Sequence, residues 1–432
     1  MSWSEGYRRK VTSAEAAVRC VGSGDHVWLH AGCNNPEELL NALVQRAPEL
    51  RDVEVTHLLT FGAAPHVDPR YQGSFRHRAL FTGPNVREAV NEGRADWVPV
   101  FLSEIPGLIR SRVIPVDVAF IQVAPPDDHG FCSYGVGVEC SKAAAESARA
   151  VVALVNRRMP RSLGDSFIHV SRLSHVVEID RPLVELPMCT EVGGVARAIG
   201  RSVADLIENG STLQMGIGEI PDAVLLFLKE KKDLGVHTEM FSDGMVELVE
   251  SGVVTGEAKT LHKGKIVSSF VLGSKKTFDF LHNNSSVEFH PTEYVNDPFV
   301  IAQNDKMVAI NSAIAVDITG QVCADSMGRS IYSGFGGQVD FIRGATRSRG
   351  GKPIIALPST ARDGKVSRIV DVLEPGSGVV TSRADVHFVV TEYGVANLYG
   401  KSLRERAQAL VACAHPEFRD ELQSAARKRR LL

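Results

Sequence analysis

The chain has 432 residues, of which 44% are hydrophobic and 23% are charged, and its formal net charge is -3. This composition is typical of a globular protein and lacks the basic surface that nucleic-acid binding requires. No apolar run reaches the roughly 18 residues of a membrane-spanning helix, so we expect neither a nucleic acid nor a membrane as a partner.

The start of the chain and its cysteines indicate the compartment. Residues 1–10 lack the apolar segment of a signal peptide. The seven cysteines are odd in number and form no C-x-x-C pair; they are Cys20, Cys33, Cys132, Cys140, Cys189, Cys323 and Cys413. This pattern argues against a disulfide framework or a zinc site and predicts a cytoplasmic location.

The two halves of the chain repeat the same predicted elements at a spacing of about 185 residues. A strand with a glycine turn, the start of a helix and a second strand are predicted at 24–32, 35–40 and 53–59. The second half repeats this pattern at 210–218, 220–225 and 236–241. Two homologous domains would explain such an ordered repeat.

Further matches extend the repeat. Residues 118–121 and 308–311 predict strands, and a serine- and glycine-rich loop follows each, at 133–137 and 333–337. Short apolar runs at 151–155 and 354–357 are typical of buried parallel strands, and helical patterns at 142–149 and 402–414 alternate with them. We therefore predict two homologous open α/β domains with mainly parallel sheets, residues 1–185 and 192–432, and an active site in the cleft between them.

Glu239 is the candidate nucleophile. It lies near the end of the predicted strand 236–241, which has Gly235 before it and Gly244 after it as turn residues. Ligands of open α/β sheets bind beyond the carboxyl ends of the strands, so a carboxylate at this point is well placed to attack a substrate. Position alone leaves a solvated surface glutamate as the alternative.

The glycine loop before this strand does not match a dinucleotide-binding fingerprint. Pro221 stands where the third glycine of G-x-G-x-x-G would follow Gly216 and Gly218. The predicted helix after Gly218 still offers unpaired N–H groups to a ligand. A tight turn without a ligand is the alternative interpretation.

Two histidines invite a metal or general-base interpretation. His129 and His237 each lie near a predicted strand end, but no second ligand occurs at a metal-like spacing. A backbone hydrogen-bond partner explains such histidines equally well. We predict no metal site.

Short motifs cover the chain from about residue 7 to about residue 422. They lie at 101–106, 125–130, 164–169, 216–221, 237–244, 333–344 and 391–407. Together they resemble the acetyl-CoA hydrolase/transferase family of family I CoA-transferases, and they are most similar to the butyryl-CoA, 4-hydroxybutyrate and acetate CoA-transferases.

The resemblance implies a transfer of CoA from a short-chain acyl-CoA to a free carboxylate through a covalent thioester on Glu239. Gly336 and Gly337 would supply backbone N–H donors to the oxyanions. The CoA-binding residues that it implies are Gln214, Met215, Gly216, Ile217, Gly218, Ile314, Gly337 and Lys365. Coenzyme A and acyl-CoA would then be substrates, with no permanently bound cofactor, and a homodimer or larger oligomer is expected.

Two other functions would use the same residues. A thioester hydrolase needs the same glutamate but admits water, and a CoA-binding protein could keep the loops without turnover. The dependence of acyl-CoA loss on added carboxylate separates the transferase from the hydrolase. Phe335 stands where the family loop commonly has isoleucine, so the sequence does not name the acid.

Overall fold

The computed structural model describes residues 2–187, 191–216 and 218–432. The chain divides into two compact units. Unit 1 comprises Met1–Pro187 and Val267–Val295, and unit 2 comprises Met188–Ile266 and Asn296–Leu432. The segment 267–295 thus belongs to unit 1 although it lies in the second half of the chain.

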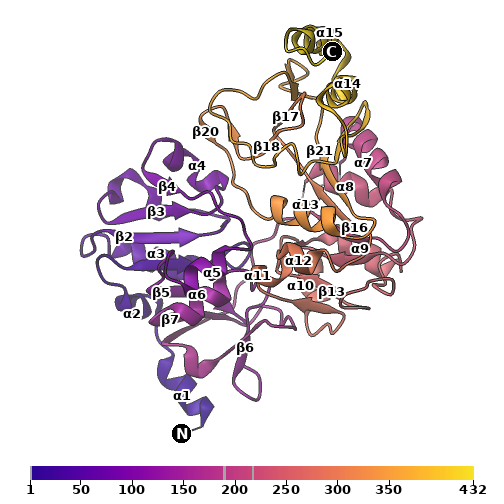
Figure 1. Cartoon of the computed structure of the whole chain (residues 1–432). Helices are drawn as coiled ribbons and strands as arrows, with labels where there is room; N and C mark the ends of the chain where they lie inside the picture. The colour runs from indigo at the N-terminus through magenta and orange to yellow at the C-terminus, as the bar shows by residue number, and fades with distance from the viewer. Residues whose placement is uncertain (1, 188–190, 217) are drawn as a thin grey trace. The chain divides into compact units, whose positions relative to one another are not determined.

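Unit 1 is built on a parallel sheet of seven strands in the order β4-β3-β2-β1-β5-β7-β9 (Figure 1). The strands are β1 (His26–Leu29), β2 (Val53–His57), β3 (Phe75–Ala79), β4 (Ala95–Trp97), β5 (Val118–Val123), β7 (Ala150–Asn156) and β9 (His175–Ile179). All residues of β5 are buried, as expected for a central strand that is covered on both faces.

The helices of unit 1 are short, and all but the first two follow a strand in the chain. They are α1 (Trp3–Lys10), α2 (Ala14–Ala17), α3 (Glu37–Gln45), α4 (Pro84–Asn91), α5 (Ile105–Arg110), α6 (Ser141–Ser147), α10 (Lys275–Leu281) and α11 (Thr292–Val295). Four 3₁₀ turns cover Val18–Cys20 (η1), Pro65–Val67 (η2), Pro69–Tyr71 (η3) and Val170–Arg172 (η4). Shorter strands are β6 (Phe131–Ser133), β8 (Phe167–His169), β14 (Phe270–Val271) and β15 (Val287–Phe289), of which β6 and β8 pair antiparallel.

Helix α3 illustrates why this sequence forms an α/β layer. Leu39, Leu40, Leu43 and Val44 recur at helical spacing and are buried in one hydrophobic core with Val53 of β2. Fully burying one leucine side chain contributes about 2 kcal/mol. The helix therefore forms mainly because its apolar face packs on the sheet.

Unit 2 has a second, mainly parallel sheet, in which its strands follow the order β11-β10-β16-β21-β25-β26. These strands are β10 (Thr212–Met215), β11 (Gly235–His237), β16 (Met307–Asn311), β21 (Lys352–Ala356), β25 (Phe388–Thr391) and β26 (Gly394–Asn397). Only the last pair, β25 and β26, is antiparallel among these. The expected α/β class with two mainly parallel sheets is confirmed.

The helices of unit 2 are α7 (Gly194–Leu206), α8 (Glu219–Leu226), α9 (Asp243–Glu250), α12 (Pro298–Ile301), α13 (Gln338–Arg347), α14 (Leu403–Cys413) and α15 (Pro416–Lys428). Small strands lie between them: β12 (Met240–Phe241), β17 (Ala315–Asp317), β18 (Val322–Cys323), β19 (Ser326–Met327), β20 (Ser330–Ile331), β22 (Thr360–Ala361), β23 (Val366–Ser367) and β24 (Ile369–Val370). Strand β13 (Ile266–Ser268) spans the boundary between the units. No described helix is both long and apolar enough to cross a membrane.

Candidate functional site

The strand order of unit 2 reverses between two neighbouring strands. From β10 the chain continues to β11 on one side, whereas β16, on the other side of β10, leads on to β21 and β25. Open parallel sheets bind ligands at the carboxyl ends of the strands at such a reversal. Here the side chains of Gln214 in β10 and Asn311 in β16 lie within hydrogen-bond distance across it (3.2 Å from Asn311 Nδ2 to Gln214 Oε1).

Glu239 lies in a turn rather than inside a strand. Strand β11 ends at His237 and β12 begins at Met240, so the predicted continuous strand 236–241 is wrong at its centre. The Thr238 hydroxyl lies 3.0 Å from the Met240 carbonyl oxygen, and this local hydrogen bond favours a turn over an extended strand. The turn places Glu239 just beyond the carboxyl end of β11.

The Asn296 amide contacts the carboxylate of Glu239. Asn296, which is fully buried, donates from Nδ2 to Glu239 Oε2 at 2.8 Å. Although Glu239 keeps part of its surface exposed, burial of its carboxyl group raises the pKa to about 7, and the hydrogen bond from Asn296 acts in the opposite direction. At neutral pH a substantial fraction of this carboxyl group is therefore protonated.

Gly337 lies against this pair. A Cβ atom at Gly337 would overlap both Glu239 Oε2 and Asn296 Nδ2, and it would stand 2.9 Å from Glu239 Cδ. The backbone of Gly337 itself is ordinary, with φ of -95°. The glycine is therefore required by space and not by backbone conformation.

The loop before α13 brings the two predicted oxyanion donors close to the predicted nucleophile, Glu239. Gly336 has a left-handed φ of 53° and Gly337 is the N-cap of α13. The first N–H groups of a helix have no partner within it. The predicted set of Glu239, Gly336 and Gly337 thus forms one local arrangement, and Asn296 adds a member that sequence reasoning missed.

Besides Gly337, the predicted CoA-binding residues lie after β10, after β16 and between β22 and β23. Gln214 and Met215 end β10, Gly216 follows them, and Gly218 is the N-cap of α8; an added Cβ at Gly216 or Gly218 would meet nothing within 4 Å. Ile314 follows β16, where its N–H donates to the Cys323 carbonyl.

The predicted CoA-binding set also includes Ile217 and Lys365. Ile217 lies outside the described residues. Lys365 is exposed in the turn between β22 and β23, and no described hydrogen bond or ion pair joins it to Glu239. Its role as a CoA ligand stays a prediction from the resemblance.

Buried groups also support the strand before Glu239. Lys259 is buried, and its Nζ donates to the carbonyl oxygens of Val236 at 2.9 Å and of Lys265 at 2.8 Å. His237 is fully buried, with its ring 6.2 Å from that of Phe341 in α13. His129 is exposed, and its N–H donates to Asp127 Oδ1.

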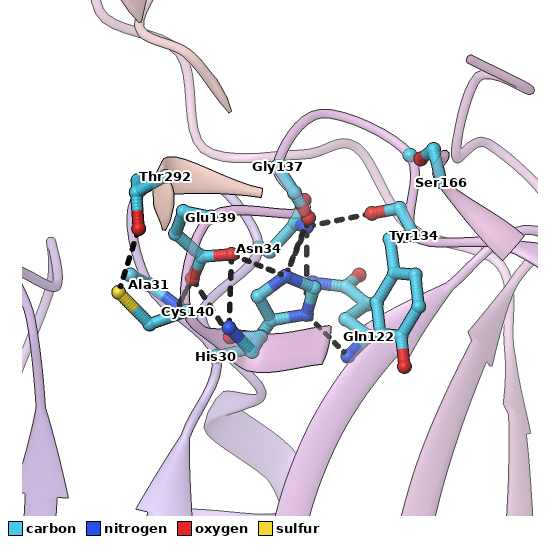
Figure 2. A network of polar contacts seen from close by, with 12 residues as sticks. His30, Ala31, Asn34, Gln122, Tyr134, Gly137, Glu139, Cys140, Ser166 and Thr292 are labelled. Atoms are coloured by element: carbon cyan, nitrogen blue, oxygen red, sulfur yellow. Dashed lines mark hydrogen bonds and ion pairs between the residues drawn. The ribbon is translucent and has the colours of Figure 1, made fainter. Parts of the chain in front are cut away.

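Unit 1 has a buried polar network at its own strand reversal, between β1 and β5 (Figure 2). The backbone N–H of Gln122 donates to His30 Nδ1 at 3.1 Å, and His30 Nε2 lies 2.8 Å from the Gly137 carbonyl oxygen. The Glu139 carboxylate lies 3.7 Å from His30 Nε2 and accepts a hydrogen bond from Ser141 Oγ at 2.7 Å. Burial lowers the pKa of His30 despite this carboxylate. A neutral imidazole that accepts on Nδ1 and donates from Nε2 satisfies both backbone groups.

A second buried group in unit 1, the histidine cluster, consists of His57, His66 and His77. His66 Nε2 lies 3.1 Å from His77 Nδ1, and the rings of His57 and His77 are 4.3 Å apart. Burial lowers the pKa of His57 to about 4 and that of His66 to about 3, and it lowers the pKa of His77 well below its ordinary value. The cluster is therefore neutral in the folded protein near neutral pH.

Family models match both parts of the chain. The model described as the acetyl-CoA hydrolase/transferase N-terminal domain matches residues 1–186, and the corresponding C-terminal domain model matches residues 273–426.

Named proteins and a solved structure are similar over almost the full length. The chain is 52% identical over 429 residues to the 4-hydroxybutyrate coenzyme A transferase of Clostridium kluyveri, which covers 99% of this chain and 100% of that protein. It is 38% identical to the butyryl-CoA:acetate CoA-transferase of Anaerostipes caccae over 99% of this chain and 98% of that protein. The crystal structure of RipA from Yersinia pestis superposes with a TM-score of 0.94 at 37% identity, covering 100% of both chains.

Proposed function

The chain belongs to the acetyl-CoA hydrolase/transferase family and is a short-chain acyl-CoA:carboxylate CoA-transferase of the 4-hydroxybutyrate/butyrate type, and we propose that it works through a covalent thioester on Glu239. The observation that carries this mechanism is the carboxylate itself. It lies at the carboxyl end of β11, is bonded to the Asn296 amide and has a pKa of about 7.

The first half-reaction forms the covalent intermediate. A carboxylate oxygen of Glu239 attacks the thioester carbonyl carbon of the acyl-CoA, the carbon–sulfur bond breaks, and CoA leaves as a thiolate. The product on the protein is a mixed anhydride. The thiolate then attacks the glutamyl carbonyl carbon, which releases the first carboxylate and leaves CoA bound to Glu239 as a thioester.

The second half-reaction is the reverse with another acid. The incoming carboxylate attacks the glutamyl carbonyl carbon and displaces the CoA thiolate. The thiolate attacks the acyl carbonyl carbon of the new anhydride, so a new acyl-CoA leaves and the Glu239 carboxylate is regenerated. No net proton transfer or redox step is needed, because one thioester and one carboxylate are exchanged for another pair.

Asn296 and Gly337 have separate tasks in this mechanism. The Asn296 amide orients the nucleophilic carboxylate and keeps its pKa from rising further. Gly337 leaves the space beside the carboxylate open, and the N–H groups of Gly336 and Gly337 serve as oxyanion donors. Losing one such donor typically costs a factor of about 100 or more in rate.

The glycine loop after β10 and Ile314 after β16 would hold CoA at the strand reversal of unit 2. Acyl-CoA and a small carboxylate are substrates. We propose further that no cofactor is bound permanently and that the protein is a cytoplasmic homodimer or larger homo-oligomer.

Intact-protein and peptide mass spectrometry after mixing with acetyl-CoA or butyryl-CoA, without an acceptor acid, tests the mechanism. We expect a CoA-sized adduct on the peptide that contains Glu239, and we expect an added carboxylate to remove it. Glu239→Gln should form no adduct. An adduct on another residue would overturn the assignment of Glu239, and acyl-CoA loss that is independent of carboxylate would favour the hydrolase.

A further inference from the structure

Thr238 contacts two segments of the proposed mechanism, the turn that contains Glu239 and the end of β10 before the glycine loop. It is fully buried and directly precedes Glu239. Its hydroxyl oxygen lies 3.0 Å from the carbonyl oxygen of Met240 and 3.3 Å from that of Met215. Met215 ends β10 and directly precedes Gly216 of the glycine loop, so one hydroxyl reaches both the turn with the nucleophile and the base of that loop.

The strand register explains why a side chain is needed here. Strands β10 and β11 are parallel, with Thr212 opposite Gly235 and Leu213 opposite Val236. Continuing this register places Met215 opposite Thr238, but β11 ends at His237 and the strand pairing ends at Leu213 and Val236. The Thr238 hydroxyl thus provides a cross-strand link at the point where the two strands part.

We propose that Thr238 is a positioning residue that couples the glycine loop to the carboxylate of Glu239, an inference that rests on the proposed function. A hydroxyl has a single proton to donate and two carbonyl acceptors within reach. A ligand that shifts Met215 at the base of the loop therefore changes the hydrogen bond that shapes the turn at Met240. The covalent neighbour of Thr238 in that turn is Glu239.

Hydrogen exchange followed by mass spectrometry tests the coupling directly. Adding CoA to the unmodified protein should slow exchange both in the peptide that covers β10 and Gly216 and in the peptide that covers Thr238–Phe241. In Thr238→Val, which keeps the branched shape and loses the hydroxyl, CoA should protect only the first peptide. Thr238→Ser, which restores a hydroxyl, should restore protection of the second.

Single-turnover formation of the Glu239 adduct at saturating acyl-CoA gives a second readout. Thr238→Val should slow it about fivefold to tenfold, the factor that corresponds to one ordinary hydrogen bond, and Thr238→Ser should recover most of the rate. Thr212→Val is the matched control, because Thr212 is also fully buried in this sheet and its hydroxyl has no hydrogen-bond partner among the described residues. The control should keep the unmodified rate.

The outcomes separate the two proposals. If CoA protects both peptides in Thr238→Val as well, the coupling is wrong and the function stands. If CoA protects neither peptide in the unmodified protein, both the proposed CoA site and the proposed coupling are wrong. A loss of rate in Thr238→Val that Thr238→Ser does not recover would indicate a packing effect and would also overturn the coupling.

Discussion

Replacing Glu239 by glutamine should stabilise the protein above neutral pH while it abolishes turnover. Burial raises the pKa of Glu239 from its ordinary value of 4.5 to about 7. A carboxyl group with a higher pKa in the folded chain than in the unfolded chain lowers the free energy of unfolding once it ionises. This penalty is absent below about pH 4.5, grows as the pH rises and is complete above about pH 7.

The expected size follows from the same values. One pKa unit corresponds to about 1.4 kcal/mol. The rise of the pKa from 4.5 to about 7 therefore corresponds to a penalty on the order of 3 kcal/mol at full ionisation. Glutamine has nearly the same shape and does not ionise, so Glu239→Gln should recover most of this free energy at about pH 8.5 and less than about 1 kcal/mol at about pH 5.

Urea unfolding of both proteins at these two pH values measures the difference. Glu421→Gln is a suitable control, because Glu421 is exposed on α15 and its replacement should change the free energy of unfolding by less than about 0.5 kcal/mol. An equal gain for Glu239→Gln at both pH values, or no gain at the higher one, would refute the link between burial and the raised pKa.

Three further predictions concern the site and unit 1. Gly337→Ala should slow adduct formation at least about tenfold, because its methyl group would displace the carboxylate; Gly194→Ala, where an added Cβ meets nothing within 4 Å, should not. Asn296→Ala should move the rising limb of the kcat/KM–pH profile to higher pH, because the hydrogen bond from Asn296 lowers the pKa of Glu239 and its loss would raise that pKa. An unchanged limb would show that Asn296 does not act on the Glu239 carboxyl group. The histidine cluster should make unit 1 less stable as the pH falls below 6.5, the ordinary pKa of histidine. The folded state holds these histidines neutral, so its stability relative to the unfolded chain is greatest above pH 6.5 and decreases as protons bind the unfolded histidines below it. Hydrogen exchange in peptides from β2 and β3, corrected for its intrinsic pH dependence, should accelerate there, and unchanged protection at about pH 5 would contradict this.

The parts of the fold that the sequence predicted are those with local signals. Continuous apolar runs predicted β7 and β21, and the expected helix 402–414 corresponds closely to α14, which begins with a capping box of Ser402 and Glu405. The glycine-rich loops also marked the turns after β10 and before α13. Each of these signals lies within a few residues of the feature that it predicts.

The parts that were missed depend on contacts between distant residues. Asn296 is 57 residues from Glu239 in sequence, and nothing in its neighbourhood distinguishes it from any other buried asparagine. The break in the strand at Thr238 arises from a side-chain hydrogen bond that an alternating pattern cannot reveal. The histidine cluster likewise assembles from two strands and a 3₁₀ turn.

The pKa of Glu239 also has a stoichiometric consequence. Near pH 7 about half of the molecules carry a proton on this carboxyl group. Conversion to the glutamyl-CoA thioester removes the titrating group, so loading the protein with acyl-CoA should release about half a proton per site at pH 7. The release should approach one proton in mildly acidic solution and vanish in alkaline solution. A burst of acid in a weakly buffered stopped-flow experiment would thus count the active sites and report their charge in the resting protein.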